Sequence, residues 1–313
     1  MVDYSVIIPS YRADFETLER TVQSVLSQKY SAKEIIIIDD NGGGIFSSFI
    51  QKIEKKYADS VKVIYNEENK GANFSRNRGV CSASSTYIAF LDSDDVWNEY
   101  YLFEVAKLIE EKNAEFITTN YQVVHADGIL PPEYNCKKFK SGNISKKELY
   151  GDLIGPTSTV VIKKDLILEA GLFDECLPAR QDYDMWLRVT KIADIVYNYN
   201  ANVKIFRCGK ESISSSYLRN VKGTQIVLQK ILQNRELSEL EKKNIKAAHF
   251  KYMSLSCILC DAYAEGRKYG CESLKNKFDK ELAIWCLLCC TPFLFSWMRK
   301  LRRFFLYQKS NIK

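Results

Sequence analysis

The chain has 313 residues, 46% of them hydrophobic and 27% charged, a balance that excludes disordered, collagen-like and polytopic membrane proteins. Its formal net charge is +6, and Arg299–Lys313 alone contain six Lys and Arg and no acidic residue. The other 39 basic residues are matched by 39 acidic ones, so the positive excess lies entirely in this tail. A neutral body argues against nucleic acid as a partner.

The N-terminal residues Met1–Tyr4 lead directly into an apolar run, without the charged segment that opens a signal peptide. Ten cysteines without an export signal predict reduced thiols and a cytoplasmic location. Two pairs, Cys257 with Cys260 and Cys286 with Cys289, have the spacing of zinc ligands but fall in apolar helical patterns. We interpret them as buried thiols.

Short apolar runs alternate with polar segments of helical spacing over about the first 120 residues. The runs are Tyr4–Pro9, Glu34–Asp39, Val61–Tyr65, Tyr87–Leu91 and Glu115–Thr119. Repeated strand–helix–strand units predict an α/β fold with a Rossmann-like, mostly parallel sheet that carries helices on both faces. Ligands of such sheets bind at the carboxyl ends of the strands, and polar clusters follow the first, second and fourth runs.

Two further strands, Thr157–Ile162 and Ile195–Arg207, are predicted on either side of a helix at Gln181–Ile192. Later residues show helical patterns. The predicted helices there are Val221–Gln233, Ser238–Glu265 and Lys280–Tyr307. This change of pattern predicts a domain boundary near residue 216, between an α/β domain of residues 1–216 and a helical region of residues 217–313.

Three carboxylates stand within four residues at Asp92-Ser93-Asp94-Asp95, directly after the fourth apolar run. They repel one another unless a cation intervenes, and a divalent ion with oxygen ligands meets that need. One carboxylate together with diphosphate oxygens suits Mg²⁺ or Mn²⁺. The alternative is a helix N-terminus capped by Asp, but the position after a strand favours a functional site.

Three other clusters allow both a functional and a structural interpretation. Asp39-Asp40 precedes three glycines and could form a surface turn. Lys70–Gly79 contains three cations that could contact phosphates or begin a solvated helix. Asp182 opens a predicted helix, where it could act as a base or as an ordinary first-turn acid.

In this order the clusters resemble those of the family-two glycosyltransferases, inverting enzymes with a GT-A fold. The matching residues are Val6–Tyr11, Ile37–Asp40, Lys70-Gly71 with Arg76-Asn77, Leu91–Asp95 and Asp182–Trp186. They extend from residue 4 to about residue 215, roughly two thirds of the chain. The resemblance implies that residues 1–216 form a nucleotide-sugar-binding catalytic GT-A domain, followed by a helical C-terminal extension.

The resemblance also implies roles at the nucleotide. Tyr11 would lie against the base, with Pro9 and Ser10 shaping that pocket. Asp40 would accept a hydrogen bond from the base, which suggests uracil and therefore a UDP-sugar.

Around the diphosphate, Lys70 and Arg76 would belong to the nucleotide site, and Asp92 would approach the ribose or the sugar. Asp94 would hold Mg²⁺ or Mn²⁺, which neutralises charge on the leaving diphosphate. Asp182 would take the proton from the acceptor hydroxyl, so that a single displacement inverts the anomeric carbon.

Two departures from the family pattern bear on the site. Gln181 stands where many relatives carry an acid before the base. Many relatives also carry a metal-binding His shortly after the position of Arg207, and this chain has none there. The metal would then be held by Asp94, the diphosphate and water, or Lys210 would supply positive charge.

The tail begins with a charge-free run, Leu282–Met298, which as a helix would be about 26 Å long and is interrupted by Pro292. A bilayer core is roughly 30 Å thick, so a spanning helix is disfavoured. Residues 294–313 form a basic, aromatic amphipathic pattern typical of helices that lie on anionic membranes. Packing on the catalytic domain and an oligomer contact are the alternatives.

Taken together, the sequence predicts an inverting, metal-dependent glycosyltransferase that moves a sugar from a UDP-sugar to a glycan or lipid-linked glycan in surface polysaccharide synthesis. It would work in the cytoplasm, peripherally on the inner face of the membrane. One alternative is a catalytically inactive nucleotide-binding partner subunit, because the His is missing. The other is a sugar nucleotidyltransferase, which needs a Gly-rich loop that Pro9–Asp14 lacks.

Overall fold

The computed structural model describes residues 2–125, 128–129, 139–207 and 216–289. The chain forms two compact units. The first comprises Met1–Ser145, Leu153–Glu175 and Gln181–Cys208. The second comprises Lys146–Asp152, Cys176–Arg180 and Gly209–Lys313. The domain boundary at residue 216 stays a prediction.

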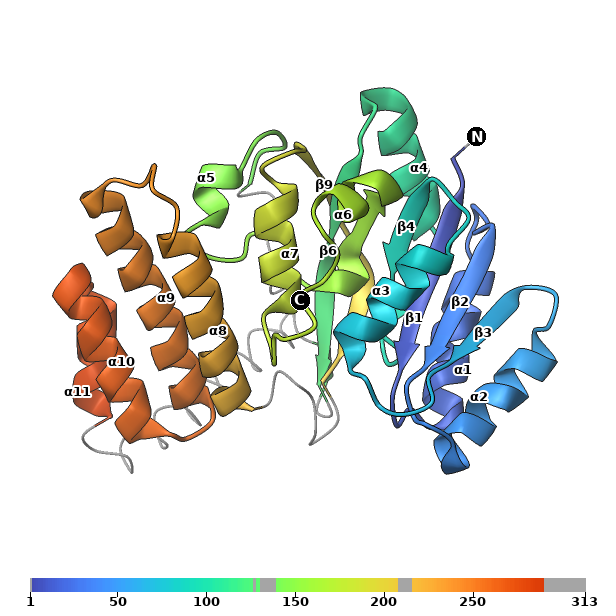
Figure 1. Cartoon of the computed structure of the whole chain (residues 1–313), viewed down its shortest axis with the longest axis horizontal. Helices are drawn as coiled ribbons and strands as arrows, with labels where there is room; N and C mark the ends of the chain where they lie inside the picture. The colour runs from blue at the N-terminus through green and yellow to red at the C-terminus, as the bar shows by residue number, and fades with distance from the viewer. Residues whose placement is uncertain (1, 126–127, 130–138, 208–215, 290–313) are drawn as a thin grey trace. The chain divides into compact units, whose positions relative to one another are not determined.

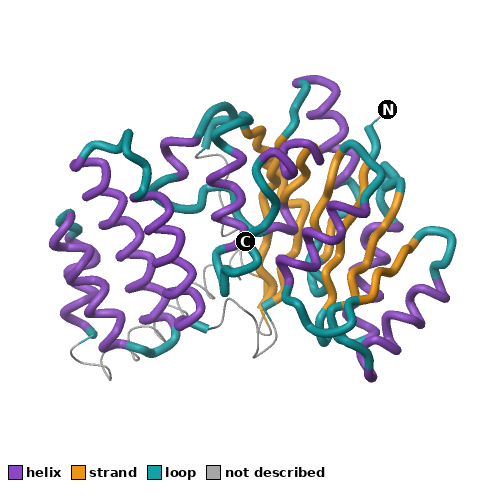
Figure 2. Tube along the Cα trace, in the orientation of Figure 1, coloured by secondary structure: helices purple, strands orange, loops and turns teal. Residues whose placement is uncertain are grey.

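In the described part of the first unit, nine strands form one sheet in the order β3-β2-β1-β4-β8-β6-β9-β5, with β7 paired to β6 (Figures 1 and 2). The strands are β1 (Tyr4–Ser10), β2 (Glu34–Asp39), β3 (Val61–Tyr65), β4 (Tyr87–Phe90), β5 (Val96–Trp97), β6 (Phe116–His125), β7 (Gly128–Ile129), β8 (Val160–Lys163) and β9 (Ile195–Phe206). Each predicted run contains a strand, but Thr157–Thr159 of the predicted strand Thr157–Ile162 form a 3₁₀ turn and β8 begins only at Val160. The α/β class is confirmed.

The sheet has a parallel half and a mixed half. Strands β1 to β4 pair in parallel, as the strand–helix alternation predicted. Strand β8 runs antiparallel to both β4 and β6, whereas β6 and β9 are parallel. The parallel half brings the ends of β1, β2 and β4 to one edge, where the sequence analysis expected the ligand.

Helices cover both faces of this sheet because successive strand residues point to opposite sides. The helices of the first unit are α1 (Phe15–Leu26), α2 (Gly44–Lys56), α3 (Ala72–Ser82), α4 (Tyr101–Lys112), α6 (Lys164–Glu169) and α7 (Gln181–Val189). Residues Val6 and Ile8 of β1 pack in a cluster with α1, α2 and α4, whereas Ile7 packs in a second cluster with α3, α6 and α7. The expected two-sided covering is therefore present.

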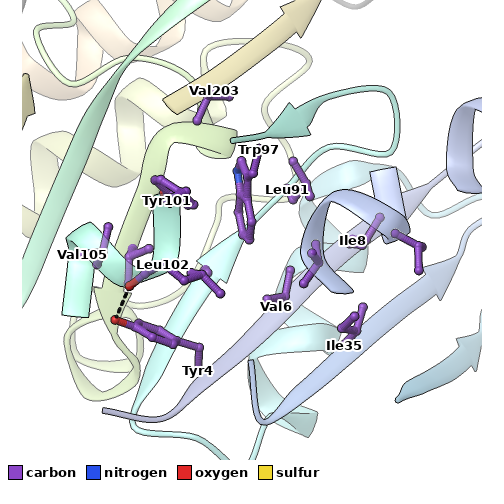
Figure 3. Packing of buried hydrophobic residues seen from close by; sticks show 14 of the residues in the cluster. Tyr4, Val6, Ile8, Ile35, Leu91, Trp97, Tyr101, Leu102, Val105 and Val203 are labelled. Atoms are coloured by element: carbon purple, nitrogen blue, oxygen red, sulfur yellow. Dashed lines mark hydrogen bonds between the residues drawn. The ribbon is translucent and has the colours of Figure 1, made fainter. Parts of the chain in front are cut away.

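Figure 3 shows the first of these clusters. Trp97 and Tyr101 stack at 4.5 Å between ring centroids, and the Tyr4 hydroxyl donates to the Leu102 carbonyl oxygen at 3.4 Å. On the opposite face, a Cβ on Gly79 would lie 2.5 Å from the Ile7 side chain. Only glycine lets α3 lie this close to β1, which fixes α3 beside the ligand edge.

The second unit is helical. Its first helix, α5 (Ser145–Glu148), starts at Ser145, which is counted with the first unit, and continues into the second. Its later helices are α8 (Tyr217–Leu232), α9 (Glu239–Leu259), α10 (Tyr263–Asn276) and α11 (Lys280–Leu288). Ser238 and Glu241 form a capping box that begins α9.

The single helix predicted over Ser238–Glu265 is wrong, because the chain turns between α9 and α10. Asp261 has a left-handed backbone with φ 61°, and the Ala262 amide donates to the Cys257 carbonyl at 2.9 Å. The apolar periodicity continues across this turn, so it could not reveal the break. The last helix predicted, Lys280–Tyr307, is described as α11 up to Leu288, and residues 294–313 lie outside the described residues.

Candidate active site at the carboxyl ends of the strands

The polar clusters after β1, β2 and β4 lie at one edge of the sheet. Ser10 is in register with Asp39, and the Asp40 amide donates to the Ser10 carbonyl at 2.9 Å. The Leu91 amide donates to the Ile7 carbonyl at 3.0 Å, which brings the Asp92 loop beside the end of β1. Three of the predicted clusters, far apart in sequence, thus meet at one site.

The end of β1 presents an aromatic ring beside a buried hydroxyl. The Tyr11 side chain is 47% exposed, and the Arg12 guanidinium lies 5.0 Å from its ring centroid. Ser10 is buried, and its Oγ has no hydrogen-bond partner among the described residues. Pro9, the residue before Ser10 in β1, is half-buried. A planar ring open to solvent can stack on a base, and a buried hydroxyl without a partner can accept or donate one more hydrogen bond.

Asp40 is buried and organises the loop that begins α3. Its Oδ1 accepts from Asn66 Nδ2 at 2.7 Å and from the Lys70 backbone N at 2.9 Å. Its Oδ2 accepts from the Gly71 backbone N at 2.9 Å. If Asp40 also accepts a hydrogen bond from a base, as predicted, it must do so with a carboxylate that already accepts three hydrogen bonds from this loop and from Asn66. The Lys70 side chain is exposed and pairs with Glu68.

Asp39, which the sequence analysis did not select, carries the less occupied carboxylate. Its Oδ1 accepts from the Asn41 backbone N at 2.9 Å and from Asn41 Nδ2 at 2.7 Å. Its Oδ2 is buried and has no partner among the described residues. A buried acceptor without a donor is costly, so a ligand that donates a hydrogen bond would stabilise this site.

Arg76 and Asp92 form a close ion pair, with Nη2 2.6 Å from Oδ1 and the Arg76 side chain 5% exposed. Nε and Nη1 of Arg76 are buried without a partner in the described part of the chain. The residues of α3 on either side of Arg76 fasten the segment Phe173–Glu175. Asn77 Nδ2 donates to the Phe173 carbonyl at 2.9 Å, and Asn73 Nδ2 donates to the Asp174 carbonyl at 2.8 Å. Arg76 is therefore a rigid donor with two nitrogen atoms, Nε and Nη1, left to bind a ligand.

The three carboxylates after β4 have three different environments. Asp95 is buried, and its carboxylate accepts from Ser158 Oγ at 2.5 Å and from the Phe206 backbone N at 3.2 Å. Asp92 is paired with Arg76. Asp94 keeps an exposed side chain. Desolvation by the protein around the loop is the larger cause that raises the pKa of Asp94 to about 6, and the negative charge of Asp92 is the next. Burial and both neighbouring carboxylates raise the pKa of Asp95 well above its usual range.

This donor set fits a divalent cation that takes most of its ligands from a nucleotide. Among the described residues, no group of three or more His, Cys, Asp or Glu side chains is arranged to hold a metal ion. Asp94 nevertheless offers an exposed carboxylate oxygen in a crowded acidic loop, and Mg²⁺ commonly binds through one or two carboxylates plus phosphates. The stretch that contains Lys210 lies outside the described residues.

Asp182 lies half-buried in the first turn of α7, and its Oδ1 accepts from the Tyr183 backbone N at 2.8 Å. One helical turn later, the buried Trp186 indole donates to the Gly155 carbonyl at 3.0 Å. Two residues after Gly155, the Thr157 hydroxyl lies 3.4 Å from both carboxylate oxygens of Asp92. Helix α7 is thus fastened to the same loop that contacts the acidic cluster.

Besides Asp39, sequence reasoning missed Asn66, Thr157 and Ser158. Asn66 joins Asp40 to α3, and as a polar residue directly after β3 it carried the same signal as the other clusters. Thr157 and Ser158 reach the acidic loop from more than 60 positions away along the chain. No pattern in the sequence marked them.

The family model for glycosyl transferase family 2 matches residues 5–160. A putative teichuronic acid biosynthesis glycosyltransferase of Bacillus subtilis is 32% identical, over 72% of this chain and 87% of that protein. The UDP-Glc:alpha-D-GlcNAc-diphosphoundecaprenol beta-1,3-glucosyltransferase of Escherichia coli is 30% identical, over 75% of this chain and 89% of that protein.

Among solved structures, residues 1–349 of TarS from S. aureus in complex with UDP-GlcNAc match with a TM-score of 0.64 and 17% identity, over 93% of this chain and 88% of that chain. That likeness confirms the GT-A fold. Fold and relatives together define an enzyme that transfers sugars, a glycosyltransferase. The chain belongs to glycosyl transferase family 2, as the order of its motifs indicated. Family membership favours this activity over the sugar nucleotidyltransferase alternative.

Proposed function

We propose that this glycosyltransferase moves a sugar from a UDP-sugar to a lipid-linked glycan, with inversion, during surface polysaccharide synthesis. The observation that carries the proposal is the meeting of an exposed aromatic ring, unpartnered acceptors and a buried guanidinium at one sheet edge. The names of the two relatives, one for UDP-Glc and a diphosphoundecaprenol-linked acceptor and one for teichuronic acid, support the substrate class.

The base of the donor stacks on Tyr11, beside Pro9. The uracil N3–H is a donor and needs a buried acceptor. The free Asp39 Oδ2 supplies one, and Asp40 Oδ2, with a single donor, supplies another. The unpartnered Oγ of Ser10, which is in register with Asp39, completes the polar lining.

The diphosphate meets positive charge from α3 and from the loop before it. Nε and Nη1 of Arg76 are already desolvated, so hydrogen bonds to phosphate oxygens satisfy them without further loss of hydration. Lys70 adds a second cation at the same loop. Asp92 orients Arg76 and lies 34% exposed, where it can accept from a ribose or sugar hydroxyl.

Asp94 would hold a divalent cation, Mg²⁺ or Mn²⁺, together with the diphosphate. When bound, that ion neutralises the negative charge that develops on departing UDP. Within the chain, Asp94 is the residue of the acidic loop that is neither buried nor ion-paired to Arg76.

Asp182 is the general base. As the acceptor oxygen attacks the anomeric carbon from the side opposite UDP, its hydroxyl proton passes to the Asp182 carboxylate. This carboxylate is half-buried at the start of α7, and its Oδ1 accepts from the Tyr183 backbone N.

A lipid-linked acceptor places the reaction at the cytoplasmic face of a membrane. None of the helices in the described ranges has the length and apolar character to cross a bilayer. We assign membrane contact to residues 294–313, which lie outside the described residues, on the strength of their basic and aromatic pattern.

The test is a screen of nucleotide sugars with a GlcNAc-diphosphate-lipid acceptor, with and without Mg²⁺ or Mn²⁺. We expect UDP release that requires one UDP-sugar, the acceptor and a divalent ion. Turnover that survives chelation would remove the metal from the proposal. Tight UDP binding without transfer or hydrolysis of any donor would instead support an inactive partner subunit.

A further inference from the structure

We propose that the helical second unit positions the general base through the short segment Cys176–Arg180. This inference rests on the proposed function, in which Asp182 takes the acceptor proton. Cys176–Arg180 belongs to the second unit, whereas Gln181–Cys208 belongs to the first. The base therefore stands two residues beyond a segment that the second unit holds.

A backbone-to-backbone approach holds this segment on α8. A Cβ added to Gly223 would lie 2.3 Å from the Ala179 carbonyl oxygen and 2.8 Å from its carbonyl carbon. Ala179 is 1% exposed and Leu177 5% exposed, so the segment buries these two side chains, whereas Cys176 is exposed. Since neither backbone can give way as a flexible side chain could, any larger residue at position 223 must displace the segment.

Arg180, the last residue of the segment, is held in an unfavourable conformation. Its φ is +64°, in the left-handed region that L-residues other than glycine rarely adopt. The guanidinium lies 4.5 Å from the Tyr252 ring centroid of α9, and Nη1 is 3.7 Å from an Asp152 carboxylate oxygen. Its side chain is 13% exposed. Such a backbone persists when surrounding contacts enforce it, and strained residues of this kind gather at functional sites.

On the other side of Asp182, α7 is fixed within the first unit. Trp186 packs against Phe116 and Phe173, with ring centroids at 5.5 and 6.1 Å, and its indole donates to Gly155. Along the chain, the base lies two residues after Arg180 and four residues before Trp186. Displacement of Arg180 changes the direction in which α7 starts, and a shift of about 1 Å in a reacting group can cost ~100-fold in rate.

Gly223 and Arg180 are therefore positioning residues, which act on the reaction through Asp182. The donor contacts at β1, β2 and α3 lie elsewhere in the first unit. Disturbing the segment should lower kcat and leave donor binding alone. A purely structural role would instead lower stability, with kcat and donor KM changed together or not at all.

The decisive variant is Gly223→Ala in the full chain, with Gly266→Ala as its matched control. Gly266 is a helix glycine of the same unit, and its added Cβ would lie 2.6 Å from the Ile258 side chain, away from Cys176–Arg180. We expect Gly223→Ala to lower kcat at least tenfold, with the donor KM and the Kd for UDP within twofold of wild type. Gly266→Ala should lower the unfolding midpoint but keep kcat within twofold.

A double-mutant cycle with Asp182→Asn separates this inference from the proposed function. If Gly223 acts through Asp182, the double variant should be no slower than Asp182→Asn alone, because residues that act as a unit are not additive. A kcat for Gly223→Ala within twofold of wild type, or a full additional loss in the double variant, would overturn the inference. If Asp182→Asn itself keeps wild-type transfer, Asp182 is not the base, and this inference falls together with that part of the proposed function. That outcome is distinct from a fully active Gly223→Ala beside an inactive Asp182→Asn, which overturns this inference alone.

A second variant covers the case in which Gly223→Ala does not fold. Arg180→Gln removes the contact with Asp152 and the cation over Tyr252 but keeps a polar side chain with the same Cβ–Cδ stem. We expect kcat to fall at least threefold with donor KM unchanged, and Arg180→Lys to restore part of that loss. Full activity in Arg180→Gln would equally overturn the proposal.

Discussion

Asp40→Asn tests whether this carboxylate is first a structural acceptor. Three donors, Asn66 Nδ2 and the backbone N–H groups of Lys70 and Gly71, point at its two oxygens from 2.7 to 2.9 Å. An amide has one oxygen, so its NH₂ group must face at least one of these donors. Both groups would then be donors, and a buried N–H would lose its acceptor.

The cost follows from the number of bonds lost. A hydrogen bond to a charged group contributes about 1.5–3 kcal/mol, and a buried donor left unpaired costs about as much again in desolvation at most. We therefore expect a loss of about 2–3 kcal/mol, which corresponds to a fall of roughly 4–12 °C in the unfolding midpoint of a domain of this size. The effect should be present without any nucleotide.

Asp39→Asn is the matched control, because the same change is made one residue away. Its Oδ1 receives both bonds from Asn41, and its Oδ2 receives none among the described residues. The amide oxygen keeps both bonds from Asn41, and the amide nitrogen replaces an oxygen that had no partner among the described residues, so no hydrogen bond is lost. We therefore expect a change within about 0.5 kcal/mol, or about 2 °C in the midpoint. Thermal unfolding of both variants, followed by UDP titration calorimetry, is the assay. Equal midpoints for the Asp40 variant and wild type would refute the reasoning.

Three other changes have defined outcomes. Asp94→Ala should abolish metal-dependent transfer, whereas Asp165→Ala, which changes an exposed acid of α6, should leave it intact. Equal rates of UDP release by Asp94→Ala and wild type would remove Asp94 from the metal site. His249 is buried with Nε2 3.0 Å from the Leu149 carbonyl, and burial lowers its pKa to about 4. The unfolded chain protonates this imidazole near pH 6.5, whereas the folded chain does so only near pH 4. The free energy of unfolding should therefore fall by about 3 kcal/mol as the pH is lowered from 6.5 to 4. Denaturant titration at several pH values should show a weaker pH dependence for His249→Gln. Replacing the four cations of Arg299–Arg303 with Gln should release the chain from anionic vesicles in sedimentation assays, as high salt should too, at about 1 kcal/mol per cation; equal binding by both forms would reject the membrane contact.

The strands were predictable because their signal is local. β-Branched runs such as Glu34–Asp39 can pack on both faces of a covered sheet, and this strand forms with the predicted bounds. The order of the motifs was also sufficient to indicate the family. Pairing direction was not predictable, since the run that forms β8 is equally apolar whether it lies parallel or antiparallel to β4. The turn at Asp261 escaped for a similar reason, because apolar residues continue on both sides of it.

In the site, the sequence by itself determined which polar clusters follow strands, and parallel pairing was enough to bring those clusters to one edge. The tertiary structure decided which carboxylate oxygen at that edge has no hydrogen-bond donor among the described residues. Asp39 and Asp40 are identical side chains in adjacent positions, yet Asn66 and the Lys70–Gly71 loop occupy the second and leave Oδ2 of the first unpartnered. Hydrogen bonding depends on where donors from distant segments arrive, and that is a property of the folded chain.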